Sequence, residues 1–376
     1  MILGIETSCD ETAAAILQEQ GKRITMLSNV IASSATLQAK YGGVIPEQAA
    51  REQIKSIIPV IEEALQQSGV EPLNLGAIAV TYGPGLIGSL LVGVETAKTL
   101  ATIWQKPLIP INHLIGHFYA NWIIPAHLRG EGKTTPSAHL GGGPRFPCLG
   151  LLVSGGHTDL VLFTNHGKYK YLGGTRDDAA GECFDKCARL LGLPYPGGPH
   201  ISKLAKKGDP TKFKLPIPMK GSKDLDFSYS GLKTAVANLV KTLPVIPTLN
   251  QVQGRNLKTK KQESRDPSLI VQDDNTLADL AATIENAIVQ SLIDKVILAL
   301  EKYPVKNIMI AGGVAANQKL MSELKLKIEN LKLKINLHIP SANLCTDNGA
   351  MIASAAFFQK HIADPLKLQA DPNLSL

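Results

Sequence analysis

One pattern of strands and helices occurs twice along this chain of 376 residues, and it constrains the fold more than any other feature. Residues 2–17 and 147–163 each show an apolar strand, a polar turn and a second apolar strand, which is the pattern of a β-hairpin. Each hairpin is followed further along the chain by a strand, a glycine turn and a helix, at residues 78–101 and 308–325. The repeat predicts two equivalent α/β halves.

Paired α/β lobes around a nucleotide are the architecture of actin, Hsp70 and the sugar kinases. We therefore expect an actin/Hsp70/sugar-kinase-like (ASKHA) α/β fold with duplicated RNase H-like lobes. The expected first lobe spans residues 1–110, and residues 111–146 supply a histidine-bearing helix and a connecting loop. The expected second lobe spans 147–355 and contains a polar, basic insertion at 242–276, and residues 356–376 form a C-terminal tail.

The composition excludes a membrane protein and a disulfide-bonded scaffold. No apolar run reaches the roughly 18 residues that span a bilayer. The five cysteines are odd in number and include no C-x-x-C pair, which indicates a reducing compartment. We expect a cytoplasmic protein with no membrane partner.

Positive charge is concentrated in two stretches, within a formal net charge of +7. Residues 203–223 contain seven lysines and one acid, and residues 255–265 contain five basic residues and one acid. Such stretches suit a polyanion such as RNA. A solvated surface without a partner is the alternative.

Four glycine turns are expected at the ends of strands: Gly83–Pro84–Gly85, Gly155–Gly156, Gly197–Gly198 and Gly312–Gly313. Glycine allows a positive φ and a close approach of phosphate to the backbone amides. One such turn is ordinary turn chemistry, but four in one chain favour a nucleotide site. The chain has no Walker A motif and no G-x-G-x-x-G after a strand, which excludes the P-loop and Rossmann folds.

Two histidines in the stretch NHLIGH, His113 and His117, lie one turn apart if the stretch is helical, which is ligand spacing for a transition metal. Leu114 occupies the position where the H-E-x-x-H peptidase motif has its glutamate base. A third ligand could come from Asp347 in LCTDNGAMIA, which otherwise would be the N-cap of the following helix. Cys345 is a further candidate, although its apolar flank suits a buried small residue.

Other polar residues lie beside the glycine turns. Asp10 and Glu11 fall in the first hairpin turn, where carboxylates could act through a metal or orient a reacting group, or could simply serve the turn. Asp185 and Lys186 precede an expected helical stretch. Asp185 could bind a ribose hydroxyl or an amine and Lys186 a phosphate, or the two could be an exposed helical pair.

A family resemblance rests on motifs that follow one another over nearly the whole chain. They are ETSCDET, YGGVIPE, TYGPGLIGSLLVG, NHLIGH, LVSGGHT, DDAAGECFDKCARLLGLPYPGGP, FSYSGLKTA, AGGVAANQ and LCTDNGAMIA. In these motifs the chain resembles the universal tRNA N6-adenosine threonylcarbamoyltransferases, formerly described as O-sialoglycoprotein endopeptidases. The resemblance implies transfer of the threonylcarbamoyl group from threonylcarbamoyl-AMP to N6 of the adenosine 3′ of the anticodon in ANN-decoding tRNAs.

The resemblance also implies roles for individual residues. His113, His117 and Asp347 match metal ligands, for one divalent ion per subunit, iron or zinc with iron favoured. Asp10 and Glu11 match acidic residues important for activity. The positions that match the adenylate site are Leu152, Val153, Ser154, Gly155, Gly156, Asp185, Gly198 and Asn317. The implied partners are tRNA, a smaller paralogous subunit and an ATPase subunit.

The chain departs from some relatives at Ile115, where they have glutamate, and at Gln53, where they have histidine. Two other functions remain open at this point. A zinc endopeptidase would explain the histidine pair but lacks its base, and an ATP-dependent small-molecule kinase of the same fold group would not need the histidines. We expect that a bound ion would orient substrate oxygens rather than generate hydroxide.

Overall fold

The computed structural model describes the chain except residues 22, 35–44, 125–142, 244–273 and 360. Most of the basic insertion expected at 242–276 therefore lies outside the described residues. The chain forms two compact units. Unit 1 comprises Met1–Ser154, Asp159–Gly173 and Ala299–Leu376, and unit 2 comprises Gly155–Thr158 and Gly174–Leu298.

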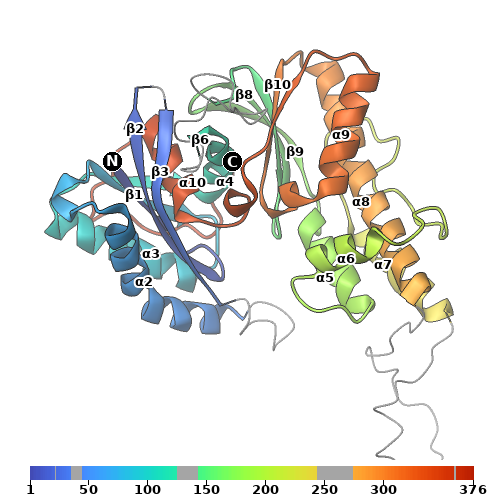
Figure 1. The fold of residues 1–376 in the computed structure, drawn as a ribbon, viewed down its shortest axis with the longest axis horizontal. Helices are drawn as coiled ribbons and strands as arrows, with labels where there is room; N and C mark the ends of the chain where they lie inside the picture. Colours follow the sequence, from blue (N-terminus) through green and yellow to red (C-terminus); the bar gives the residue numbers. More distant parts are fainter. Residues whose placement is uncertain (22, 35–44, 125–142, 244–273, 360) are drawn as a thin grey trace, which may run out of the picture. The chain divides into compact units, whose positions relative to one another are not determined.

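The first sheet belongs to unit 1 and has the order β5-β4-β1-β2-β3-β6. Figure 1 labels its strands β1, β2, β3 and β6. Its strands are β1 (Ile2–Glu6), β2 (Glu11–Gln20), β3 (Arg23–Ser33), β4 (Ala77–Gly83), β5 (Leu108–Asn112) and β6 (Ile123–Ile124). Strand β1 pairs with β2 in the antiparallel direction and with β4 in the parallel direction. The predicted hairpin and the following strand are thus confirmed as neighbours in one sheet.

The second sheet repeats this plan, with the order β11-β10-β7-β8-β9. Its strands are β7 (Cys148–Val153), β8 (Thr158–Asn165), β9 (Lys168–Gly174), β10 (Asn307–Ala311) and β11 (Asn336–His338). Strand β7 lies between its hairpin partner β8 and the parallel strand β10, as β1 lies between β2 and β4. The duplicated α/β plan of the ASKHA class is confirmed.

Helices cover the first sheet on both faces because β1 is apolar on both. Leu3 and Ile5 pack in one core with α2 (Pro46–Ser68) and α3 (Ile87–Ile103). Ile2 packs in the other core with α4 (His113–Tyr119) and α10 (Gly349–Phe358). This second core also contains residues of β7, β8 and β10, so α4 and α10 are buried between the two sheets of unit 1.

Glycines bring these two buried helices close to their neighbours. A Cβ on Gly349 would lie 2.6 Å from the backbone nitrogen of Ala15 in β2. A Cβ on Gly116 of α4 would lie 2.8 Å from Cδ1 of Ile352 in α10. The hydroxyl of Ser354 in α10 donates to the carbonyl of Tyr119 at 2.8 Å. The two helices therefore hold each other in register.

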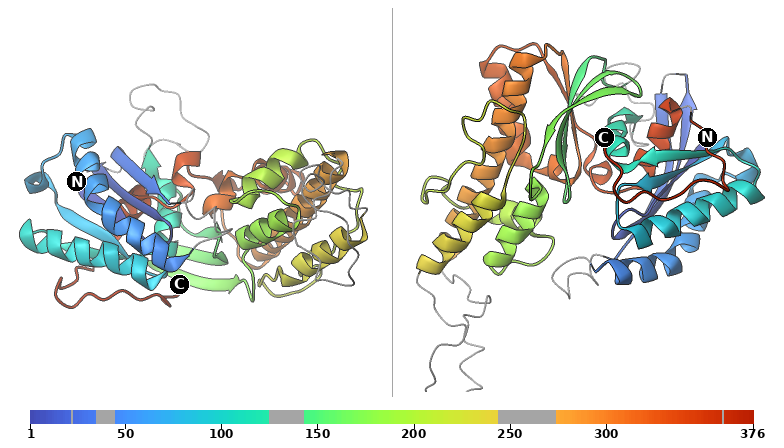
Figure 2. Two further views of the ribbon diagram at one scale, coloured as in Figure 1. Left: turned by 90° about the horizontal axis from the view of Figure 1, so that it is seen from below. Right: turned by 180° about the vertical axis from the view of Figure 1, so that it is seen from behind.

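The helices α5 (Ala180–Leu190), α6 (Gly197–Ala205), α7 (Ser230–Thr242) and most of α8 (Asp274–Lys302) form unit 2, which both views in Figure 2 show as a helical group. The apolar residues of 277–302 recur at helical spacing, and the structure shows this stretch as part of α8. Helix α9 (Gln318–Asn330) follows β10 and belongs to unit 1. No described helix is long and apolar enough to span a membrane.

The C-terminal residues pack within unit 1, near the ends of β4 and β5. The backbone N–H of Asp371 donates to the carbonyl of Tyr82 at 2.7 Å, beside the Gly83–Pro84–Gly85 turn. The side-chain amide of Asn112 donates to the carbonyl of Ser375 at 3.1 Å. The end of the chain is thus fastened to the residue that precedes His113.

Candidate metal site and adenylate turns

The two histidines lie in the short helix α4, which begins where β5 ends. Asn112 is its N-cap, and its side-chain oxygen accepts from the backbone N–H of Leu114 at 2.9 Å. His113 and His117 are therefore one turn apart on one face, with exposed fractions of 7% and 1%. Their ring centroids are 4.7 Å apart with an edge-to-face angle of 77°.

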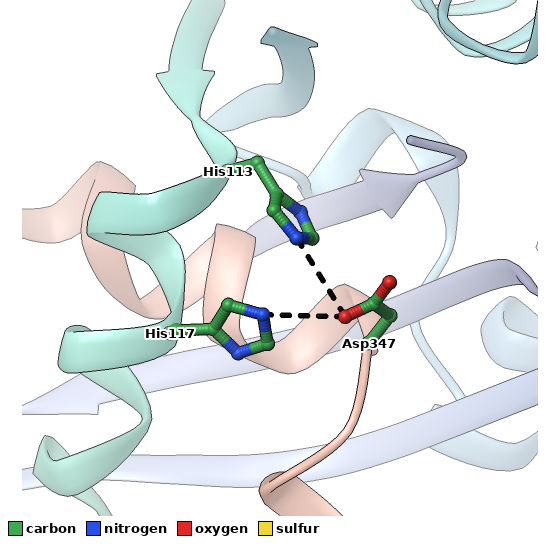
Figure 3. A group of neighbouring side chains, drawn as sticks. All are labelled: His113, His117 and Asp347. Carbon is green, nitrogen blue, oxygen red and sulfur yellow. Dashed lines mark ion pairs between the residues drawn. The ribbon is translucent and has the colours of Figure 1, made fainter. Parts of the chain in front are cut away.

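Asp347 comes from the far end of the chain, on the turn before α10. Its Oδ1 atom lies 3.2 Å from Nε2 of His117 and 3.6 Å from Nε2 of His113 (Figure 3). The N-cap of α10 is Asn348, whose side-chain oxygen accepts from the backbone N–H of Met351 at 2.9 Å. Because Asn348 caps the helix, the capping role considered for Asp347 is wrong.

The donor atoms of these three residues fit a metal ion. One ligand atom from each lies within 4.8 Å of the others, and among the described residues this is the one such group. Both ring nitrogens of His117 are buried without a hydrogen-bond partner among the residues described, although Oδ1 of Asp347 is near. Buried polar atoms are normally satisfied, so an unsatisfied imidazole beside a carboxylate indicates a place for a cation. Cys345 lies outside this group, and its Sγ is 3.6 Å from the carbonyls of Pro340 and Ser341.

Glu6 is a residue of this site that the sequence does not point to. Its Oε2 atom lies 3.1 Å from Nδ1 of His113 and accepts from the hydroxyl of Thr81, and its Oε1 accepts from the backbone N–H of Ser8 at 2.5 Å. A carboxylate at Nδ1 favours the proton there and leaves the Nε2 lone pair toward Asp347. The available signal is an acid at the end of an otherwise apolar strand, ILGIE.

The same carboxylate changes the basicity of His113. Burial lowers the pKa of His113, but the negative charges of Glu6 and Asp347 outweigh burial and raise it to about 9. The two carboxylates therefore make this part of the site favourable for positive charge, which suits a cation.

Asp10 and Glu11 lie beside Asp347. Glu11 is the first residue of β2, and burial, the charge of Asp347 and a hydrogen bond with Asp10 raise its pKa to about 10. The turn that carries both acids is held by Gln53, whose Nε2 donates to the carbonyls of Cys9 and Glu11 at 2.9 Å each. Gln53, one of the departures from relatives, thus has a structural role in this chain.

The first candidate residues for adenylate binding lie at the end of strand β7 and in the turn that follows it. Leu152 and Val153 are buried, and Ser154, Gly155 and Gly156 follow in the turn. Gly312, at the end of the parallel strand β10, has a φ of +89°, and a Cβ there would run into the carbonyl oxygen of Val153. Only glycine fits, so the two turns lie against each other.

Asn317 follows the β10 turn and caps α9, because its side-chain oxygen accepts from the backbone N–H of Leu320 at 2.8 Å. The helix N-terminus beside it carries partial positive charge that suits an anion. The first sheet has an equivalent close approach, since a Cβ on Gly85 would lie 2.5 Å from the carbonyl oxygen of Ser8.

The remaining candidates lie in unit 2, and two expectations about them are wrong. Asp185 and Lys186 lie inside α5 and do not precede a helix, and Gly197–Gly198 begins α6 after α5 and does not end a strand. Oδ1 of Asp185 accepts from the backbone N–H of Gly197 at 2.7 Å, so a carboxylate within one helix holds the start of the next. Burial raises the pKa of Asp185.

Lys186 is held in two ion pairs. Its Nζ lies 2.6 Å from Asp178 and 2.8 Å from Glu182. The structure therefore pairs Lys186 with two acids other than Asp185, and because both Asp185 and Lys186 are half-buried, the alternative of an exposed helical pair is wrong.

Comparison with known proteins gives one family. The family model described as tRNA N6-adenosine threonylcarbamoyltransferase (TsaD) matches residues 25–354. Proteins of that name from Thermomicrobium roseum and Geobacillus thermodenitrificans are 46% and 44% identical, over 100% of this chain and 97% and 96% of theirs. A solved structure, component A of (R)-2-hydroxyglutaryl-CoA dehydratase from Acidaminococcus fermentans, is 16% identical with a TM-score of 0.45, over 96% of this chain and 98% of that one.

Proposed function

The chain belongs to the tRNA N6-adenosine threonylcarbamoyltransferase family, and we propose that it transfers the threonylcarbamoyl group of threonylcarbamoyl-AMP to N6 of the adenosine 3′ of the anticodon in ANN-decoding tRNAs. The observation that carries the proposal is the convergence of His113 and His117 with Asp347, from the far end of the sequence, on one point where both histidines are buried and the aspartate is partly exposed. The curated relatives are named as transferases, and neither the endopeptidase nor the kinase alternative gains support.

His113, His117 and Asp347 are the proposed ligands of one divalent ion, and Glu6 orients the first of them. Two nitrogens and one carboxylate suit iron or zinc, of which we favour iron. When bound, such an ion supplies positive charge that orients the oxygens of the threonylcarbamoyl group and stabilises charge that develops on its carbonyl.

The chain's own residues provide the rest of the reaction. The backbone amides of Ser154, Gly155 and Gly156 and the N-terminus of α9 at Asn317 hold the phosphate of the adenylate. The N6 amine forms the new C–N bond as the C–O bond to phosphate breaks and AMP leaves. The amine loses one proton, which a phosphate oxygen of the departing AMP accepts, and the carboxyl groups of Asp10 and Glu11 orient the amine. Water is the competing nucleophile, and burial of the histidines keeps it from this point.

A smaller paralogous subunit is the first proposed protein partner. Helices α2 and α3 pack against each other in unit 1, and the exposed apolar residues of each include a pair that is four positions apart. Ile54 and Ile58 of α2 are 64% and 47% exposed, and Ile87 and Leu91 of α3 are 49% and 44% exposed. Large exposed apolar side chains gathered on adjacent helices are typical of an interface.

The ATPase subunit and the place of action are further proposals. The ATPase subunit follows from the family resemblance alone. We expect the protein to act in the cytoplasm, where its tRNA is found, and its five cysteines are free, as a reducing compartment requires.

The test is a pair of substitutions on one turn. Purified protein with its partners, threonylcarbamoyl-AMP and an ANN-decoding tRNA transcript should give the modified adenosine, detected by mass spectrometry of nucleosides. Asp347→Asn removes a proposed ligand and should slow the reaction about 100-fold or more. Cys345→Ala, two residues away, should retain the wild-type rate. Wild-type activity of Asp347→Asn, or absence of the modified adenosine with the wild-type protein, would refute the proposal.

A further inference from the structure

The lysine-rich segment at residues 203–223 belongs to unit 2, and its positive charge is available to a ligand. All seven lysines are exposed: Lys203, Lys206, Lys207, Lys212, Lys214, Lys220 and Lys223. The side-chain ammonium groups of five of them, all except Lys212 and Lys223, form no hydrogen bond or ion pair with any other residue that the structure describes. Other lysines of the same unit, Lys186, Lys233 and Lys295, are paired with Asp178 or Asp224.

The segment is an ordered part of the fold, fastened to α8 near both ends. A Cβ on Gly208 would lie 2.6 Å from the backbone nitrogen of Asp279, and the side chain of Asp279 accepts from the N–H of Asp209 at 2.7 Å. At the other end, Nζ of Lys295 lies 2.8 Å from the carbonyl oxygen of Asp224. Positions 279 and 295 are 16 residues apart on one helix, or about 24 Å. The segment therefore displays its lysines along about that length.

The acids near the segment are already engaged. Asp224 pairs with Lys295 and Arg176, and Asp226 pairs with Arg176. Asp209 accepts from the hydroxyl and the N–H of Thr211. A surface that only keeps a protein soluble mixes both signs of charge, whereas this segment has seven lysines against the single acid Asp209, and the acids that follow it are held in ion pairs with Lys295 and Arg176.

The segment begins close to a proposed adenylate residue. Helix α6 starts at Gly197 and ends at Ala205, so Lys206 lies about 12 Å along the helix direction from Gly198. A tRNA whose target adenosine reaches the adenylate would bring neighbouring backbone phosphates within reach of such a surface. Lysine contacts to phosphate are independent of sequence and depend on charge and spacing.

We propose that residues 203–223, fastened along α8, form a docking surface for the phosphate backbone of the substrate tRNA. This inference rests on the proposed function, because it names the surface that positions the tRNA for the same reaction. The surface contributes binding and not chemistry. Its loss should raise the KM for tRNA and leave kcat close to the wild-type value.

The experiment compares two fourfold charge reversals in the full chain. The first variant is Lys206→Glu, Lys207→Glu, Lys214→Glu and Lys220→Glu. The control reverses four lysines at the end of α9 and just after it, in unit 1, that are also exposed and unpaired among the described residues: Lys325, Lys327, Lys332 and Lys334. Both variants change the net charge equally. Binding of a fluorescent ANN-decoding tRNA transcript is measured at several salt concentrations, and tRNA modification is measured with the partners present.

The first variant should bind tRNA about tenfold more weakly or worse, and the slope of log K against log salt should fall by about three. The control should stay within about threefold of wild type if the loss comes from residues 203–223 and not from the change in net charge, which is the same in both variants. Equal losses of tRNA affinity in both variants would overturn the proposal. Normal tRNA binding by the first variant together with a loss of modification would also overturn it, because the surface would then serve another partner. If the wild-type protein does not modify tRNA, the proposed function fails. If the wild-type protein modifies tRNA and the first variant has an unchanged KM for tRNA, only the docking surface is refuted.

Discussion

Glu6→Gln tests how the proposed metal site is organised, because it removes a charge and keeps the shape of the side chain. Glu6 is 1% exposed and accepts from Ser8, Thr81 and His113. A glutamine has one accepting oxygen, so its NH₂ group must face either the N–H of Ser8 or the donors at Thr81 and His113. In either orientation the partner of Nδ1 is weaker, and the proton is less firmly held on that nitrogen.

The magnitude follows from the role of the carboxylate. Partners that hold a ligating histidine typically contribute 10- to 100-fold in metal affinity. We therefore expect the metal Kd of Glu6→Gln to rise by about 10- to 100-fold, or about 1.4 to 2.8 kcal/mol. At a fixed excess of metal, the same amount is lost from the stabilisation that the ion gives to the fold. The metal-dependent rise in Tm should therefore shrink by several degrees.

The assay is a titration of metal-free protein with Fe²⁺ or Zn²⁺, followed by calorimetry and by thermal unfolding with and without the ion. Asp159→Asn is the matched control, since it also converts a buried carboxylate of unit 1 to an amide and lies outside the three-residue group. Its metal Kd should equal that of wild type. A metal Kd for Glu6→Gln within twofold of wild type would refute the argument that Glu6 orients His113.

Three further predictions concern stability and assembly. Burial raises the pKa of Asp159 to about 6, so the stability that this carboxyl contributes is complete below about pH 4 and is lost as the pH rises through 6. In the wild-type protein this effect should lower the free energy of unfolding by up to about 3 kcal/mol between pH 4 and pH 8. Asp159→Asn should remove this pH dependence, measured by urea unfolding at both pH values. Gly312→Ala should lower the unfolding free energy by more than about 1 kcal/mol, whereas Gly231→Ala, in open space on α7, should not lower it. Ile54→Glu should abolish association with the smaller subunit in size-exclusion chromatography, and Leu366→Glu, on an 86% exposed residue, should not.

The duplicated fold could be predicted because its signal is local. Each hairpin and each strand–glycine turn–helix unit is a short run of alternating or continuous apolar residues bounded by turn residues. Strand β3 is not predicted in the same way, since most of its residues are neither fully buried nor exposed, so RITMLSNVIAS shows no clean alternation. The position of Asp185 within a helix is hard to predict, because the stretch DDAAGEC at the start of α5 contains several residues that are common in turns.

The partners of the candidate site are harder to predict, because they depend on contacts between distant residues. The i, i+4 spacing of His113 and His117 is visible in the sequence. Asp347 is available as a ligand only because Asn348, and not Asp347, is the N-cap of α10. Glu6 is 107 residues from His113 in the sequence. Only the pairing of β1 and β4, and of β4 and β5, places the ends of these strands together.

The geometry of the proposed metal site follows from packing in the core. Asp347 is positioned by α10, and the histidines by α4, and each helix is fixed by contacts that only small residues allow, such as Gly349 against β2 and Gly116 against Ile352. Substitutions in these contacts change the distances between ligand atoms without touching a ligand. A methyl group at Gly116 should therefore weaken metal binding as well as the fold, and the metal-free protein should lose less stability than the metal-bound form. An equal loss in both forms would show that the helices do not set the spacing of the ligands.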